Sequence, residues 1–163
     1  MAAANTYVAI SPAYTLGSAQ ASVTFSSISG AYTDLVLVAN VKGVGTGYSQ
    51  IQINGSAVNL SRLWLRGDGS SAVSSKASDN YIVGGTTVNS TDFAFNSITH
   101  IFNYANTTTY KTLLTRANNA ALGAEAVVNT WRSASAITSI SYNISSYNMD
   151  IGSTFSLYGI LAA

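Results

Sequence analysis

The chain has 163 residues, a length that suits one domain, and only 8% of them are Asp, Glu, Lys or Arg, against roughly 25% in an ordinary domain. Hydrophobic residues make up 47% and the net charge is +1, which excludes a charge-rich disordered chain and the dense basic face of a nucleic-acid-binding protein. The sequence has no cysteine, so disulfides and thiolate metal sites are excluded. A thinly charged surface of hydroxyls and amides is typical of a protein assembled with copies of itself or with a partner.

The first third of the chain predicts strands joined by tight turns. A short apolar arm at about residues 1–12 precedes an alternating strand at 20–25. Residues 34–41, DLVLVANV, are apolar on both faces, as in a central strand or in one covered by a neighbouring subunit. We interpret the glycine-rich 43–47 as a hairpin loop. Asn54-Gly55 predicts a second hairpin because both residues tolerate positive φ.

The remainder of the chain continues this pattern. Residues 62–66 predict a short strand, and the Gly-, Ser- and Asp-rich stretch that follows, up to residue 80, predicts a long exposed loop. The alanines of 116–128 favour a helix, but Asn118-Asn119 and Gly123 favour a hairpin turn, which is our interpretation. Further strands are expected at 80–83, 98–104, 109–116, 125–131, 136–144 and 154–161.

About ten short strands with no amphipathic helix predict an all-β fold, an antiparallel β-sandwich that is jelly-roll-like. No linker divides the sequence, so we expect one domain over residues 1–163 that includes the N-terminal arm. The last strand, 154–161, is aromatic and has neither the Lys nor the Pro that protects a free edge. We therefore expect it to be paired, within the chain's own sheet rather than with a neighbouring copy.

Residues able to do chemistry are few and scattered. The single histidine, His100, would need a nucleophile or an orienting carboxylate to act as a base, and we interpret it as structural. Asp68 in RGDGSS and Asp150 in NMDIGS are typical turn formers rather than a glycosidase pair. We therefore expect no catalytic residue, no cofactor and no metal, and predict that the chain is not an enzyme. No apolar run has the length of a membrane-spanning helix, so no membrane partner is expected.

Tyrosine is abundant, with ten residues in the chain, and Tyr and Trp suit protein interfaces because they combine a large area with a polar tip. Each tryptophan has an arginine close to it in the sequence, which could stack on it at a subunit contact or extend along the rim of a sheet. Core filling is the alternative for several aromatic residues. The candidate subunit-contact residues are Tyr7, Trp64, Arg66, Trp131, Arg132, Phe155 and Tyr158.

Five segments carry a resemblance when they are taken as a set. They are 16–43, which contains YTDLVLVANVK, 51–56 (IQINGS), 103–118 (NYANTTTYKTLLTRAN), 131–145 (WRSASAITSISYNIS) and 152–160 (GSTFSLYGI). In this order they resemble small virion structural proteins of tailed bacteriophages. The resemblance implies an all-β component of a virion that is assembled in the host cytoplasm, and it brings no catalytic or metal-binding residue with it.

Two functions fit such a component. The first is a capsid decoration, or cement, protein that stabilises the head by binding between major capsid protein subunits, as a homo-oligomer with a trimer favoured. The alternative is a tail fibre or tail tip module that binds host surface glycans through exposed tyrosines, drawn from Tyr48, Tyr81, Tyr104 and Tyr110. We favour the first, because a chain of one small domain has no extra segment for attachment to a fibre.

Overall fold

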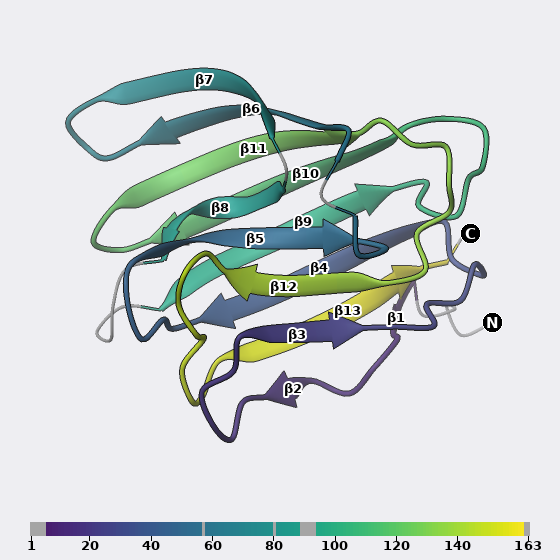
Figure 1. Cartoon of the computed structure of the whole chain (residues 1–163), viewed down its shortest axis with the longest axis horizontal. Helices are drawn as coiled ribbons and strands as arrows, with labels where there is room; N and C mark the ends of the chain where they lie inside the picture. The colour runs from purple at the N-terminus through teal and green to yellow at the C-terminus, as the bar shows by residue number, and fades with distance from the viewer. Residues whose placement is uncertain (1–5, 57, 80, 89–93, 162–163) are drawn as a thin grey trace.

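The computed structural model describes residues 6–56, 58–79, 81–88 and 94–161. Regular structure in these residues consists of strands, arranged in two antiparallel sheets that lie face to face (Figure 1). The expected all-β antiparallel sandwich is confirmed. Alternation of apolar and polar residues produces it, because each strand buries one face against the opposite sheet.

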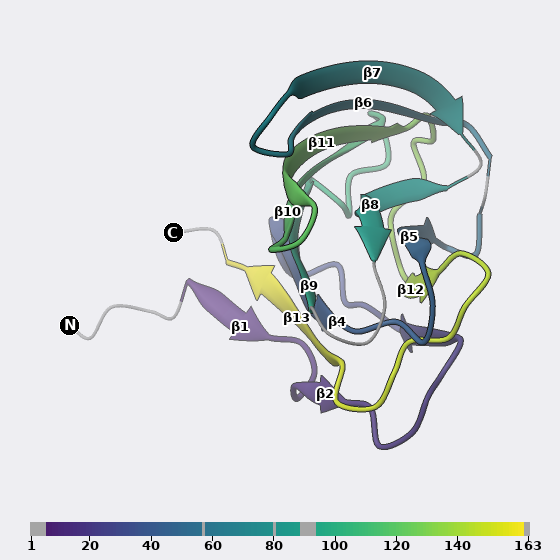
Figure 2. The same ribbon diagram turned by 90° about the vertical axis from the view of Figure 1, so that its left-hand side faces the viewer.

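The larger sheet has nine strands and supplies one wall of the sandwich. Along it the order is β1 (Tyr7–Ala9), β13 (Thr154–Ile160), β4 (Asp34–Val41), β9 (Phe95–Phe102), β10 (Lys111–Asn119), β11 (Gly123–Trp131), β6 (Leu60–Gly67) and β7 (Ala72–Asp79), with β2 (Tyr14–Thr15) also on β13. Figure 2 shows this sheet bending at its upper end, where β11, β6 and β7 pass over β8 of the second sheet.

The smaller sheet has four strands. Its order is β3 (Ser22–Phe25), β12 (Ile140–Ile144), β5 (Gly47–Ile53) and β8 (Ile82–Val88). The core lies between the two sheets and contains Leu35 and Leu37 of β4, Ile51 of β5 and the tilted ring pair of Tyr142 and Phe155, whose centroids are 5.3 Å apart. The side of the larger sheet that faces away from the smaller one is called the outer face below.

The C-terminal strand lies inside the larger sheet. β13 pairs with β4 over its whole length, from Thr154 opposite Asn40 to Ile160 opposite Asp34, and its other edge is covered by β1 and β2. The prediction that residues 154–161 pair within the chain's own sheet is therefore confirmed for Thr154–Ile160. Described residues of the N-terminal arm take part in this pairing, because Tyr7 lies opposite Ile160.

Two predicted hairpins are wrong, although the turn at Asn54-Gly55 forms. The strands on either side of 43–47 are β4 and β5, which belong to different sheets. Asn54 and Gly55 adopt the expected positive φ, 52° and 66°, yet β5 lies in the smaller sheet and β6 in the larger. Turn residues determine local backbone geometry, whereas β5 finds its partners in β12 and β8, far along the chain.

The predicted long loop before residue 80 is also wrong, because Ala72–Asp79 forms β7, paired residue for residue with β6. Only Asp68–Ser71 turns the chain. Asp68 Oδ1 accepts hydrogen bonds from the amides of Ser70 at 2.9 Å and Ser71 at 2.7 Å, which confirms the turn-forming role predicted for this aspartate. These bonds to the ionised carboxylate hold the pKa of Asp68 well below its usual range.

The hairpin interpretation of 116–128 is confirmed. β10 and β11 pair from Lys111 opposite Trp131 to Asn119 opposite Gly123. Gly123 has a φ of 120°, and a Cβ at this position would lie 2.1 Å from the carbonyl oxygen of Gly67. Alanine's helix preference is outweighed here, because the strand buries its odd-numbered residues against the core.

Candidate interaction surface

The centre of the outer face carries two adjacent rows of mostly apolar side chains. The register of β4, β9, β10, β11 and β6 sets the members of each row side by side. One row is Val36, His100, Leu114, Val128 and Leu63, and the other is Val38, Ile98, Arg116, Ala126 and Leu65. These ten residues are called the apolar band.

The band is exposed where it crosses β9, β10, β11 and β6. Leu63 and Leu65 are 57% and 56% exposed, and Ile98 is 42% exposed. Isolated apolar residues on a surface are ordinary, but a contiguous run of them across several strands marks an interaction site. Continuity along the register therefore distinguishes the band from scattered surface residues.

Polar side chains border the band at both ends of β10. On one side Asn40, Asn96 and Asn118 lie in register, and their amides bond in series, with Asn96 Nδ2 donating to Asn118 Oδ1 at 3.3 Å. On the other side Thr112 and Thr130 lie in register with Phe102, which is 37% exposed, so this row is polar on β10 and β11 and apolar on β9. An apolar centre with a polar rim is the usual anatomy of a protein interface.

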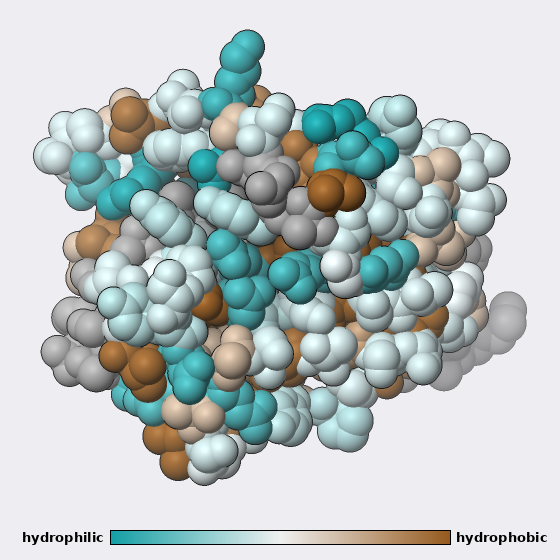
Figure 3. Space-filling model, viewed as in Figure 1, coloured by the Kyte–Doolittle hydropathy of each residue, from teal (hydrophilic) through white to brown (hydrophobic). Residues whose placement is uncertain are grey.

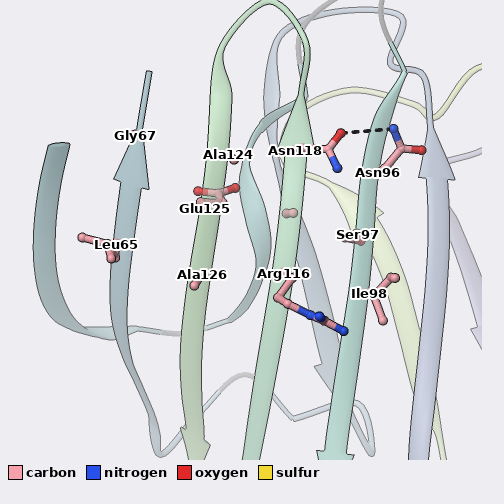
Figure 4. A pocket seen from close by; sticks show the side chains of 11 residues that line it. Leu65, Gly67, Asn96, Ser97, Ile98, Arg116, Asn118, Ala124, Glu125 and Ala126 are labelled. Carbon is pink, nitrogen blue, oxygen red and sulfur yellow. Dashed lines mark hydrogen bonds between the residues drawn. The ribbon is translucent and has the colours of Figure 1, made fainter. Parts of the chain in front are cut away.

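The outer face is hollowed above the band. A depression of about 550 Å³ is lined by residues that include Leu65, Ile98, Arg116, Asn118 and Ala126. Figure 4 shows it spanning β6, β11, β10 and β9, with the Arg116 side chain extending from β10 towards Ile98 on β9. A surface of this shape admits protruding side chains of another sheet or loop.

A histidine and an aspartate meet at the edge of the band. His100 Nε2 lies 3.0 Å from Asp34 Oδ2, and Asp34 Oδ1 accepts a hydrogen bond from the amide of Asn103 at 2.6 Å. The imidazole also stacks on the ring of Phe102, with centroids 4.1 Å apart and planes 17° apart. The fold thus supplies the orienting carboxylate that the sequence did not reveal.

The described residues around His100 do not complete a catalytic set. A small hollow of about 190 Å³ next to it is lined by Tyr7, Val36, Ile98, Leu114 and Arg116. Among these lining residues Tyr7 has the one hydroxyl, and acyl transfer at such a pair would require a serine, threonine or cysteine nucleophile beside the imidazole. Here the carboxylate fixes the ring as part of the surface.

The opposite face of the molecule is polar. On the smaller sheet Thr24 and Ser141 join their hydroxyls at 2.8 Å, and Asn143 Nδ2 donates to Gln50 Oε1 at 2.9 Å. Figure 3 shows this side as mostly pale and teal, with scattered brown. These side chains satisfy one another across strands, so this face is suited to water.

The candidate contact residues do not gather in one place. Tyr7 and Tyr158 lie on β1 and β13, and Tyr158 pairs with Val36 at the margin of the band. Trp131 and Phe155 are buried in the core, where a second copy cannot reach them in the folded chain.

The remaining candidates lie around β6. Trp64 and Arg66 alternate with Leu63 and Leu65 and therefore point to the other side of that strand. The guanidinium groups of Arg66 and Arg132 donate to the carbonyls of Leu122 and Leu60, at 3.1 and 3.2 Å. Both arginines thus bond to backbone of their own chain.

Sequence reasoning missed the exposed members of the band. The sequence does contain a signal for them in β9 and β10. Ile98, Phe102 and Leu114 are apolar although they face away from the core, which breaks the alternation of apolar and polar residues along these strands. Residues 34–41 are likewise apolar on both faces, and the structure places them in β4, centrally between β13 and β9. The face of the sheet on which a side chain lies depends on the pairing register of its strand, and the sequence alone does not determine that register.

The tyrosines proposed for glycan binding are also dispersed. Tyr104 is buried, and its hydroxyl donates to the carbonyl of Ser29. Tyr48 is exposed on β5 of the smaller sheet, and Tyr81 lies under the Arg62 guanidinium, 5.9 Å from the ring centroid. The structure therefore does not bring these residues together as a sugar-stacking platform.

Besides Tyr104, two further ionisable side chains are buried, Tyr142 and Lys111. The hydroxyl of Tyr142 is enclosed between the sheets near Ser49 and Ser97, and burial raises the pKa of Tyr142 to about 12. Lys111 Nζ donates to the carbonyl of Thr109 at 2.7 Å, and burial lowers the pKa of Lys111. Both belong to the packing of the sandwich rather than to an open site.

Comparison with known proteins adds no relative. No protein-family model matches the chain, and neither a curated protein nor a solved structure matches it. Among the described residues there is no group of three or more His, Cys, Asp or Glu side chains that could hold a metal ion. No helix in the part of the chain that the structure describes is long and apolar enough to cross a membrane.

Proposed function

We propose that this chain is a structural protein of a tailed-bacteriophage virion, a capsid decoration protein that stabilises the head by binding between major capsid protein subunits. The observation that carries the proposal is the apolar band, an exposed and mostly apolar surface on a molecule in which only 8% of the residues are charged. Such a surface is typical of one that another protein covers. The resemblance of the sequence to small virion proteins supplies the kind of particle.

The proposal includes a non-enzymatic role. Among the described residues His100 and Asp34 come closest to a catalytic pair, and their surroundings are those of a hydrogen-bonded pair at the surface. The low charge of the chain supports a structural role in an assembly. Charge repulsion keeps free proteins apart in solution, and a protein that is part of a particle does not need it. The protein is then located in the virion and needs no cofactor.

The proposed fold is a jelly roll with added strands. Support comes from the strand order, in which β1-β13-β4-β9 forms one four-stranded set that faces β3-β12-β5-β8. Two facing sets of four strands are the basis of a jelly roll. The hairpins β6–β7 and β10–β11 then extend the larger sheet and carry most of the exposed part of the apolar band.

The test is the copy number of the protein in purified virions, measured by quantitative mass spectrometry against the major capsid protein. A decoration protein is expected in numbers comparable with that subunit. A number lower by one or two powers of ten would favour the tail fibre or tail tip alternative and would direct the work to glycan binding. Absence from purified particles would overturn both virion assignments.

A further inference from the structure

We propose that the apolar band binds a partner protein that presents an aspartate or glutamate side chain to Arg116 from within an otherwise apolar patch. This inference rests on the proposed function, because it takes a virion protein as the partner, and it adds the chemistry by which the band selects that partner. It follows from the state of the Arg116 guanidinium in the folded chain and from the side chains around it.

Arg116 differs from the other three arginines of the chain. The guanidinium groups of Arg66 and Arg132 donate to carbonyls of the chain's own backbone, and that of Arg62 lies over the ring of Tyr81. Arg116 is exposed on β10, and no hydrogen bond or ion pair joins its guanidinium to another residue that the structure describes. Its charge is therefore unmatched within the described part of the chain.

The surroundings of Arg116 are apolar. In its row it lies between Ile98 on β9 and Ala126 on β11, and Leu114 lies two residues away on the same face of β10. Figure 4 shows the arginine side chain lying across the sheet next to Ile98. Arg116 lines both the depression of about 550 Å³ and the smaller hollow of about 190 Å³. A protruding side chain that enters either hollow therefore comes next to the guanidinium.

The unmatched charge determines the chemistry of the partner. A protein that covers the band removes Arg116 from water, and a buried charge without a partner opposes binding strongly. An ionised carboxylate offsets this penalty best, because its two oxygens accept two parallel hydrogen bonds from the planar guanidinium. The band therefore disfavours a wholly apolar partner and selects one with an acidic side chain at this point.

The outer face of a second copy does not supply that acid from its described residues. Asp34 borders the band, but its oxygens are engaged by His100 at 3.0 Å and by the amide of Asn103 at 2.6 Å. Glu125 alternates with Ala126 along β11 and therefore points to the core side of the sheet. The acid is thus expected on a different protein, which in the proposed function is the major capsid protein.

The first experiment measures binding of the purified chain to virions that lack it, by sedimentation with the particles over a range of chain concentrations. Arg116→Leu should weaken binding roughly 30-fold or more, because the partner's carboxylate is then buried without its counter-charge. Lys76→Gln is the matched control, since it removes a positive charge from β7, outside the band, and it should weaken binding by less than about threefold. Unchanged urea unfolding midpoints show that both variants are folded.

A second experiment identifies the acid. Arg116→Lys keeps the positive charge and places an amine at the same position. A carbodiimide, which joins an amine directly to a neighbouring carboxylate, is added to this variant bound to the particles, and the joined peptides are identified by mass spectrometry. We expect a link from position 116 to an aspartate or glutamate of the major capsid protein. The natural chain is the control and should give no link at this position.

The outcomes separate this inference from the proposed function. A chain that binds no particle overturns the proposed function and this inference with it. Binding that Arg116→Leu weakens no more than Lys76→Gln does overturns this inference alone, as does the absence of a link at position 116 or a link to a second copy. Binding to purified acidic polysaccharide of the host surface that Arg116→Leu abolishes would also overturn it. A link to an acid of another virion protein supports the role of Arg116 and overturns the decoration role.

Discussion

Asn54 Oδ1 accepts a hydrogen bond from the amide of Thr138 at 2.8 Å, which ties the turn after β5 to the segment that leads into β12. The same oxygen accepts from the amide of Ser139 at 3.1 Å, and Asn54 Nδ2 donates to the carbonyl of Ala136 at 2.8 Å. One side chain therefore holds a segment more than eighty residues away. Its φ of 52° places it in the left-handed region as well.

These two roles of Asn54 can be separated by substitution. Asn54→Gly keeps the backbone conformation and removes the side-chain bonds, and we expect a loss of about 1–3 kcal/mol of unfolding free energy. Asn54→Ala removes the bonds and adds backbone strain, for about 1 kcal/mol more. Urea unfolding of both variants measures the difference. Equal midpoints for the two variants would contradict the strain at this position.

Asp34→Ala tests the hydrogen-bonded pair of Asp34 and His100 on the outer face. It removes the acceptor for His100 and for the amide of Asn103, and we expect a loss of about 1–3 kcal/mol in urea unfolding. The same change made together with His100→Ala should be less damaging by about 0.5–1 kcal/mol, because part of the interaction is already gone. Asp150→Ala is a control, since Asp150 bonds to the amide of the next residue, Ile151. An Asp34→Ala loss that is the same in both backgrounds would show that the two side chains are not coupled.

The Tyr142 hydroxyl makes stability depend on alkaline pH. Its pKa is raised to about 12 in the folded chain from the ordinary value of 10.0, so the folded state keeps a proton that the unfolded state loses. This contribution to stability is complete below pH 10 and is lost as the pH rises towards 12, by up to about 1.4 kcal/mol per pH unit. Thermal or urea unfolding between pH 8 and pH 12 measures this slope.

Tyr142→Phe is the corresponding variant. It should remove this part of the alkaline loss while differing from the natural chain by a constant amount below pH 10. The lowered pKa of Lys111 acts with the opposite sign, because its burial penalty is relieved as the pH rises towards the ordinary value of 10.5. Equal slopes above pH 10 for Tyr142→Phe and the natural chain would contradict the prediction.

Gly85→Ala tests the close packing of β8 against the larger sheet. A Cβ at residue 85 would lie 2.0 Å from Phe95 Cζ and 2.9 Å from Ala117 Cβ, at a φ of 138°. Gly152→Ala is the matched control, with a φ of 82° and open space around the added carbon. We expect Gly85→Ala to lower the unfolding free energy by about 1–3 kcal/mol more than Gly152→Ala does. Similar losses for the two variants would mean that Phe95 moves aside at little energetic cost.

Local features of the sequence predicted the elements well. The alternation at 140–144 and the turn residues Asn118-Asn119 and Gly123 are properties of a few neighbouring residues. They identified the β10–β11 hairpin and β12, although β12 begins at Ile140 and not at the predicted residue 136. The stretch that became β7 was missed because its Ser and Ala residues are exposed and lack the apolar alternation of a half-buried strand. Pairing with β6, rather than composition, makes it a strand.

The sequence by itself determined the class of this protein: an all-β chain with little charge, turns at defined residues and a C-terminal strand that must be paired. The tertiary structure alone decided that β4, β5 and β6 are divided between two sheets, and that Leu63, Ile98, Leu114 and Val128 meet on one exposed face. The reason is physical. Turn chemistry and alternation act over a few residues, whereas the register that assembles a surface depends on strands brought together from distant parts of the chain.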